Sequence, residues 1–160
     1  YPFTTLTPNL GVVRWQDFRD YVIADIPGLI EGAHTGEGLG TQFLKHVERT
    51  DVIVHVLEVQ PEAEGVPTER DPIEDFEIIY RELEAYDPEL VERPQIVALN
   101  KIDLPYVRQE IERLRTYFEE EHDLPFIAIS AATGENLDAF KNLVGKIVYE
   151  GEEKTEFWEK

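Results

Sequence analysis

Residues 95–103 read QIVALNKID, an apolar run that ends in a polar tetrapeptide. The part 95–100 is short and nearly all apolar, which is typical of a strand covered on both faces of a parallel sheet. Residues 52–59 (VIVHVLEV) and 126–130 (FIAIS) have the same character. We therefore expect three buried strands, each followed by a loop at the carboxyl edge of one sheet, where α/β proteins bind their ligands.

Amphipathic segments lie between and after these strands. Apolar residues recur at helical spacing in residues 40–49, 71–83, 106–122 and 137–149. Asp71 followed by Pro72 is typical of a helix start, with the aspartate as N-cap. Strands that alternate with such helices predict right-handed βαβ units. The expected fold class is α/β, a three-layer sandwich with a mostly parallel sheet.

Two more strands are expected near the beginning of the chain. Residues 10–15 and 21–25 are joined by a short polar link, which predicts an antiparallel hairpin at the sheet edge. The glycine-rich residues 28–40 and the proline-containing residues 60–70 are expected to be loops. We expect one domain over residues 1–150 and a polar tail over residues 151–160.

Composition restricts the class of protein. The 160 residues are 42% hydrophobic and contain no cysteine, which excludes disulfides, zinc–thiolate sites and cysteine nucleophiles. We find no apolar run of membrane-spanning length and no signal peptide, and we expect a cytoplasmic monomer. The net charge of -19, from 34 acidic and 15 basic residues, would repel phosphate backbones. No direct nucleic-acid binding by this domain is therefore expected.

The tetrapeptide Asn100-Lys101-Ile102-Asp103 carries the most specific chemistry. Guanine presents two adjacent donors, N1–H and the N2 amine, and one carboxylate can accept from both, whereas adenine has no such pair. Asp103 would therefore select guanine, while Asn100 would tie the neighbouring loops together and the stem of Lys101 would lie over the base. The alternative is a polar helix-start loop in which Asp103 is an N-cap.

Ser130-Ala131-Ala132 follow the strand at residues 126–130. Small side chains allow backbone N–H groups to approach the guanine O6 atom, and the Ser130 hydroxyl could brace the loop. The alternative is a tight turn between a strand and a helix. One βαβ unit after an Asn-Lys-x-Asp loop, this short motif becomes much more specific.

Asp25-Ile26-Pro27-Gly28 ends the strand at residues 21–25. A carboxylate there can hold magnesium through a water, and Gly28 lets its N–H approach a terminal phosphate because no Cβ blocks the way. The alternative is an ordinary strand-ending turn. Thr4 and Thr5 could add a hydroxyl ligand to the magnesium ion, although two threonines alone carry no signal.

The order of these motifs resembles the G2 to G5 motifs of P-loop GTPases. More closely, the chain resembles the Obg family of bacterial GTPases over residues 1–149. The stretches that carry the resemblance are YPFTTLTPNLG at 1–11, DIPGLIEGA at 25–33, GEGLG at 36–40 and FLKHVERT at 43–50.

The resemblance implies GTP and GDP as ligands, Mg²⁺ as cofactor, and a switch that hydrolyses GTP slowly. It also implies a role in late assembly of the large ribosomal subunit and in stress signalling by guanosine tetraphosphate. The implied nucleotide-binding residues are Phe3, Thr4, Thr5, Leu6, Thr7, Asp25, Ile26, Pro27, Gly28, Asn100, Lys101, Ile102, Asp103, Ser130, Ala131 and Ala132. Among these, Thr5 would bind the magnesium ion directly and Asp25 through water.

Two departures affect the expected activity. No G-x-x-x-x-G-K-[ST] loop occurs in the 160 residues, so we expect a piece of a G domain that lacks the first strand, the P-loop and the glycine-rich N-terminal domain. By itself it should bind GTP very weakly and hydrolyse essentially none. Leu29 stands where Ras-like proteins place a water-orienting glutamine, which predicts slow hydrolysis. His34 is a weak candidate general base, and no catalytic residue is assigned. The alternative function is a degenerate, non-hydrolysing scaffold for protein–protein interaction.

Overall fold

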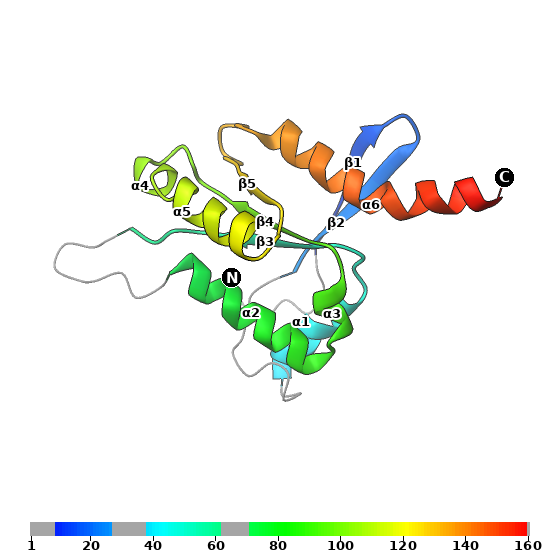
Figure 1. The fold of residues 1–160 in the computed structure, drawn as a ribbon, viewed down its shortest axis with the longest axis horizontal. Coiled ribbons are helices and arrows are strands. Elements are labelled where there is room, and N and C mark those ends of the chain that lie inside the picture. Colours follow the sequence, from blue (N-terminus) through cyan, green and yellow to red (C-terminus); the bar gives the residue numbers. More distant parts are fainter. Residues whose placement is uncertain (1–8, 27–37, 62–70, 160) are drawn as a thin grey trace.

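The computed structural model describes residues 9–26, 38–61 and 71–159 (Figure 1). The strands are β1 Asn9–Gln16, β2 Arg19–Asp25, β3 Ile53–Leu57, β4 Gln95–Leu99 and β5 Phe126–Ala128. The helices are α1 Gly38–Glu48, α2 Pro72–Tyr86, α3 Glu89–Glu92, α4 Pro105–Arg108, α5 Ile111–Arg115, the π-helical η2 Thr116–Glu121 and α6 Leu137–Glu159. No described helix is both long and apolar enough to cross a membrane.

Strands β3, β4 and β5 form a parallel sheet in that order, with β4 in the centre and buried throughout. Alternate side chains of β4 enter different cores because successive residues of a strand point to opposite faces. Val97 and Leu99 pack with residues of α2, α5 and η2, whereas Ile96 packs with Val144 of α6. The predicted α/β class, with helices on both faces of a parallel sheet, is confirmed.

The antiparallel hairpin of β1 and β2 is also confirmed. In the described part of the chain it forms a two-stranded sheet of its own. One face of it lies beside α6 (Figure 1). The Trp15 indole N–H donates to Oδ1 of Asn142 at 2.7 Å, and the Tyr21 hydroxyl donates to the Lys141 carbonyl at 2.9 Å. Gly145 lies under the Trp15 ring, where a Cβ would overlap the indole. These contacts fix the hairpin on the helix.

The helix start at residue 71 agrees with the sequence. Asp71 is the N-cap of α2, its side chain accepts from the Ile73 N–H at 2.9 Å, and Pro72 occupies the first helical turn. The short helix α3, which closely follows α2, was not predicted from the sequence. The glycine-rich loop at 28–40 and the loop at 60–70 lie largely outside the described residues.

Residues 106–122 are helical for the most part, but the prediction of one continuous helix is wrong. The segment is divided into α4, α5 and the wider π-helical turns of η2, with a turn at Gln109 and Glu110 between α4 and α5. The apolar stripe is nevertheless preserved, because Val107, Leu114 and Phe118 are all buried. Burial therefore determined which side chains face the sheet, while the backbone between them departed from a regular α-helix.

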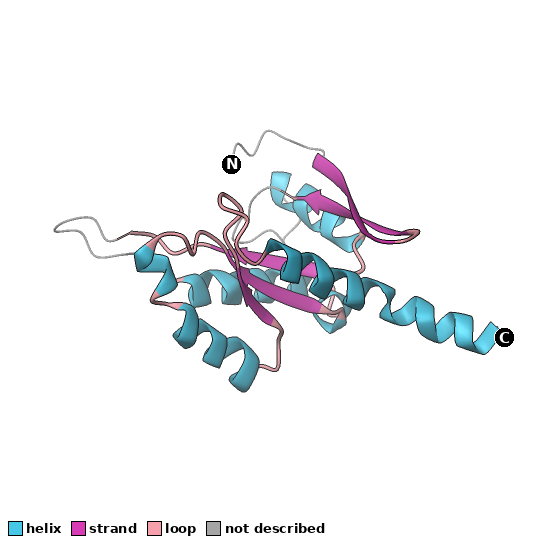
Figure 2. Cartoon of the chain, turned by 90° about the horizontal axis from the view of Figure 1, so that it is seen from above, coloured by secondary structure: helices cyan, strands magenta, loops and turns pink. Residues whose placement is uncertain are grey.

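Helix α6 continues to Glu159, through the segment expected as a polar tail. Its last turns extend away from the rest of the chain (Figure 2). The domain boundary at residue 150 stays a prediction.

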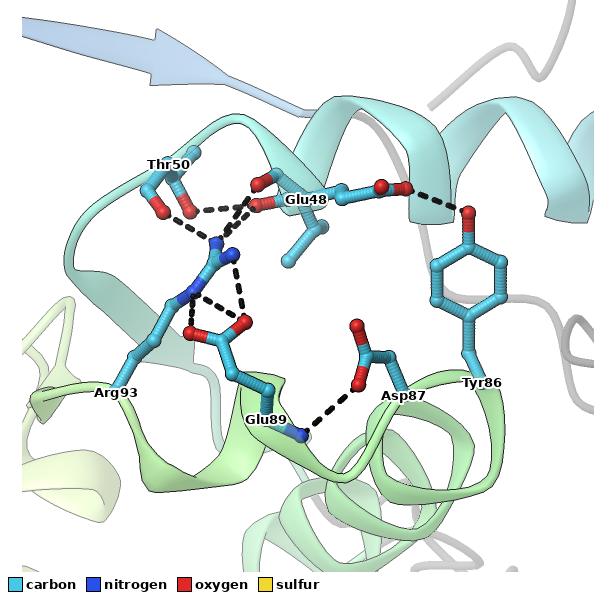
Figure 3. A network of polar contacts seen from close by, with 7 residues as sticks. Glu48, Thr50, Tyr86, Asp87, Glu89 and Arg93 are labelled. Carbon is cyan, nitrogen blue, oxygen red and sulfur yellow. Dashed lines mark hydrogen bonds and ion pairs between the residues drawn. The ribbon is translucent and has the colours of Figure 1, made fainter.

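The end of α1 is anchored to the end of α3 by Arg93, which directly follows that helix (Figure 3). The Arg93 guanidinium donates to backbone carbonyls at the end of α1, including Glu48 at 2.9 Å, and also to Thr50. Glu89 holds the same guanidinium at 2.8 Å, and the Tyr86 hydroxyl donates to the Glu48 carboxylate at 2.7 Å. Leu44, at the centre of the apolar cluster beneath, is fully buried. The C-terminal half of α1 is thus fixed, since cations satisfy the free carbonyls of a helix end.

His55 lies in the core of the parallel sheet. His55 is 4% exposed in β3 and its Nε2 atom lies 2.7 Å from Oε1 of Gln95. Burial lowers the pKa of His55 below its ordinary value of 6.5, although the Gln95 hydrogen bond acts in the opposite direction. The folded protein therefore favours the neutral imidazole.

We expect the chain to lose stability as the pH falls below 6.5. The unfolded chain binds a proton at His55 in that range while the folded chain resists it, so the contribution is fully present above pH 6.5 and is lost toward the lower, folded-state pKa. One proton accounts for at most about 1.4 kcal/mol per pH unit. Urea unfolding at about pH 7.5 and about pH 5.5 measures this. His55→Gln should reduce the difference, and the control His122→Gln, at an exposed histidine, should not. Equal pH dependence in all three proteins would contradict this role of His55.

Candidate nucleotide-binding site

The carboxyl ends of β4 and β5 bring together the two loops that are predicted to contact the base. We call these loops, residues 100–103 and 130–132, the base-side loops. The Ile129 N–H donates to the Leu99 carbonyl at 2.8 Å, and the Ile102 N–H donates to the Ile129 carbonyl at 3.2 Å. The Ile102 side chain is 2% exposed and packs in the core beneath the loops. Ile102 therefore anchors the loop, and any contact of this residue with a nucleotide would come from its backbone.

Asp103 and Ser130 form the centre of the site. The Ser130 hydroxyl is fully buried and donates to Oδ1 of Asp103 at 2.8 Å, while it accepts from the Thr133 N–H at 3.2 Å. The Asp103 carboxylate is thus held through one oxygen in an otherwise exposed position. A carboxylate held in this way can still accept hydrogen bonds from a pair of donors on a ligand.

The alternative interpretation of Asp103 as a helix N-cap is wrong. The N-cap of α4 is Leu104, and no side-chain hydrogen bond caps this helix. The carboxylate of Asp103 is directed to Ser130 on the neighbouring loop instead. Its position is therefore explained by contact between the two loops and not by the start of α4.

Asn100 ties the loops together, as the sequence predicted. Its Oδ1 atom accepts from the Ala131 N–H at 3.0 Å, across 31 residues of sequence. Ala131 and Ala132 are exposed, and neither side chain projects enough to block access to the adjacent backbone. The two loops consequently have a defined relative position before any ligand is present.

Four further residues hold the second loop, and their role was not predicted from the sequence. Asn136 donates from Nδ2 to the Ala128 carbonyl at 2.9 Å, and Arg108 forms an ion pair with Glu135 at 2.6 Å. Gly134, with φ of +86°, provides a left-handed conformation that glycine adopts easily. The pair between Arg108 and Glu135 could not be found from spacing, because Arg108 lies at the end of α4 and Glu135 lies in the loop after β5.

Lys101 has an unexpected partner. Its Nζ atom lies 3.2 Å from Oε1 of Glu58, which directly follows β3. The backbone of Lys101 has φ of +69°, in the left-handed region. Glu58 therefore joins the candidate site from a third strand end.

The phosphate-side residues are described only in part. Asp25 ends β2 opposite Asn9, and Ile26 packs against the apolar cluster of α1, α2 and α3. The other predicted phosphate-side residues, Phe3, Thr4, Thr5, Leu6, Thr7, Pro27 and Gly28, lie outside the described residues, as do Leu29 and His34. The structure thus brings together the residues predicted to contact the base, and nucleotide contact by these and by the phosphate-side residues stays a prediction.

The parallel sheet, the hairpin and the position of the loops define a class of protein, the P-loop GTPases. The structure of Aquifex aeolicus Era Y63A bound to GDP·AlF4⁻ is similar, with a TM-score of 0.58, 25% identity, and coverage of 90% of this chain and 45% of that one. A second Era structure, in complex with MgGDPNP and 16S ribosomal RNA nucleotides, has a TM-score of 0.61 at 23% identity with the same coverage, and supports the fold alone.

The chain belongs to the family described as 50S ribosome-binding GTPase, whose model matches residues 1–101. The GTPase Obg of Solibacter usitatus is 50% identical over 142 residues, which cover 89% of this chain and 40% of that protein. The GTPase Obg of Desulforudis audaxviator is 56% identical over 138 residues, 86% of this chain and 31% of that protein. The resemblance to Obg GTPases is confirmed. The chain spans 40% or less of the length of these two relatives.

Proposed function

We propose that this chain is the guanine-reading and switch-bearing part of a molecular switch that binds GTP and GDP. The observation that supports the proposal best is the position of Asp103. Its carboxylate is held by the buried Ser130 hydroxyl, and the loop carrying Ser130 is tied to Asn100. A preorganised carboxylate can discriminate well between guanine and other bases, because the side chain loses little conformational freedom when the base binds.

The proposed base contacts follow from hydrogen-bond chemistry. Asp103 accepts from N1–H and the N2 amine of guanine, the loop at Ser130, Ala131 and Ala132 lies against the O6 edge, and the Lys101 stem covers one face of the ring. Adenine would leave the carboxylate facing an acceptor at N1, which is repulsive. The site therefore favours guanine over adenine, because adenine loses both hydrogen bonds to the carboxylate and adds a repulsive contact.

A magnesium ion fits the residues proposed for the phosphate side. Asp25 provides a carboxylate at a strand end and Thr5 a hydroxyl, and hard oxygen donors of this kind suit Mg²⁺ together with phosphate oxygens. The described residues contain no group of three or more histidine, aspartate or glutamate side chains that could hold an ion. When bound, the ion would neutralise phosphate charge, and Asp25 would orient one of its waters.

The proposed activity of the longer protein is slow GTP hydrolysis. Leu29 cannot orient a water molecule, so another group must do so. The family description supports a place at the large ribosomal subunit. Within the proposal, the switch acts in the assembly of this subunit and in the response to stress. Guanosine tetraphosphate, which carries the same base, is a further candidate ligand, and the cytoplasm is the proposed location.

A titration of the 160-residue chain with guanosine and adenosine 5′-monophosphate tests base recognition, since this contact needs no phosphate-binding loop. We expect amide resonance shifts at Asp103, Ser130 and Ala131 with the guanine nucleotide, and affinity for the adenine nucleotide weaker by about tenfold or more, as loss of hydrogen bonds to a charged group implies. Inosine monophosphate, which lacks the N2 amine, should lie between them. Equal affinities, or shifts confined to other loops, would contradict the proposal.

A further inference from the structure

Glu58 and Lys101 come from neighbouring strand ends that the backbone holds in register. Leu57, which ends β3, pairs with Leu99 of β4, and the Asn100 N–H donates to the Leu57 carbonyl at 3.1 Å. Just beyond these strand ends, Glu58 and Lys101 form their ion pair at 3.2 Å. The distance between the two α-carbons is thus set by the sheet.

The backbone of Lys101 is constrained as well. Its φ of +69° is uncommon for a residue with a side chain, and its carbonyl accepts from the Leu104 N–H at 3.0 Å in the turn that precedes α4. The direction in which the lysine stem leaves the loop is therefore fixed. The free end of the stem retains several rotatable bonds, and ordering them costs conformational entropy.

The ion pair contributes little to the fold. The side chains of Lys101 and Glu58 are 50% and 58% exposed, and pairs of this kind are weak and screened by salt. Its consequence lies in the orientation of Lys101. The carboxylate of Glu58 holds the ammonium group at the end of β3 and so restricts the directions in which the lysine stem can lie.

We propose that Glu58 is a positioning residue for guanine binding, which acts by holding the Lys101 ammonium group so that the stem lies ready to cover the base. This inference rests on the proposed function. Glu58 makes no contact with the base itself, and it determines how much rotamer freedom Lys101 loses when the nucleotide binds. Removal of its charge weakens guanine binding and leaves the fold unchanged.

The variant Glu58→Gln tests this, because glutamine keeps the length of the side chain and removes the charge. Its matched control is Glu112→Gln, which removes the carboxylate from another exposed ion pair, also at 3.2 Å, between Glu112 and Arg115 on α5. Affinity for guanosine 5′-monophosphate is measured by amide shifts in the whole 160-residue chain. We expect a loss of about two- to fivefold for Glu58→Gln, the range of an exposed ion pair, and no change for Glu112→Gln.

A double-mutant cycle separates positioning from a general structural effect. Lys101→Met keeps an apolar stem but removes the ammonium group, so Glu58→Gln should have no further effect on affinity in that background. The thermal midpoint should stay the same in both glutamine variants. An equal loss of affinity with and without the Lys101 ammonium, or no loss at all, would overturn the inference. If the unmodified chain does not respond to the nucleotide, the proposed base site itself is wrong.

Discussion

Replacing Asp103 with asparagine is expected to change the base preference of the chain from guanine to xanthine. The asparagine amide would present one donor and one acceptor where the carboxylate presents two acceptors. Guanine would then place its N2 amine against the amide N–H₂, and both groups are donors. Xanthine has a carbonyl oxygen at C2 and keeps the N1–H donor, so it matches the asparagine. Aspartate and asparagine side chains have nearly the same shape, and the Ser130 hydroxyl can donate to the Oδ1 atom of either one.

The change should be large, because the hydrogen bonds between guanine and Asp103 have a charged acceptor. Removing one such hydrogen bond weakens binding by about tenfold or more. Titration of the Asp103→Asn chain with guanosine and xanthosine 5′-monophosphates measures both preferences. Asp123→Asn is the matched control, since Asp123 is also exposed but lies after η2, away from the loops. An Asp103→Asn chain that keeps its preference for guanine would show that another group reads the base.

Replacing Phe118 with alanine is expected to destabilise the chain by about 3–5 kcal/mol, the usual cost of removing a fully buried phenylalanine. Phe118 has no exposed surface and lies between two aromatic rings. The centroid of its ring lies 4.9 Å from that of Phe76 in edge contact and 6.1 Å from that of Phe126 in stacked contact. The same core contains Ile102 and Ala128, which support the base-side loops.

Phe18→Ala is the matched control because Phe18, in the hairpin turn, is fully exposed. Urea unfolding at neutral pH should show a large fall in the midpoint for Phe118→Ala and essentially none for Phe18→Ala. In the folded fraction, the amide resonances of Ser130 and Asp103 should also move in Phe118→Ala, since the core lies directly below them. Similar midpoints for the two variants would mean that the cluster around Phe118 is not the main core of the domain.

The parallel sheet was predictable because its strands have to be apolar on both faces. The run at residues 95–99 is buried at every position, and no amphipathic helix has that composition. The loops proposed to contact the base could be singled out for a chemical reason, since few side chains can match the two donors of guanine. Asn100 and Asp103 could therefore be placed at the strand end from the sequence, whereas their partners Ala131 and Ser130 are defined by the fold.

Other features depend on contacts between distant parts of the chain. Glu58 follows a strand as one more exposed carboxylate, and only the register of β3 with β4 places it beside Lys101. The close contact of Gly145 with Trp15 arises because the hairpin packs on α6, across a sequence separation that no local pattern spans. The division of residues 105–121 into three helical pieces was also missed, because their apolar spacing alone fits an uninterrupted helix.

The two parts of the proposed site differ in what holds them in place. Asn100, Asp103, Ser130 and Ala131 are joined by hydrogen bonds within the chain and need no ligand to be in position. On the proposed phosphate side, Asp25 ends β2, while α1 is fixed at its C-terminal end by Arg93. We therefore expect base recognition in this chain by itself, whereas phosphate binding and hydrolysis require a phosphate-binding loop, which these 160 residues do not contain.

A crystal structure of the 160-residue chain soaked with guanosine 5′-monophosphate tests base recognition most directly. The N1 and N2 atoms of guanine should each lie within hydrogen-bond distance, about 3 Å, of the Asp103 carboxylate, with Ser130 still donating to the same side chain. The stem of Lys101 should lie over one face of the ring. A guanine bound elsewhere, or one that turns its O6 edge toward Asp103, would contradict the proposal that this carboxylate selects the base.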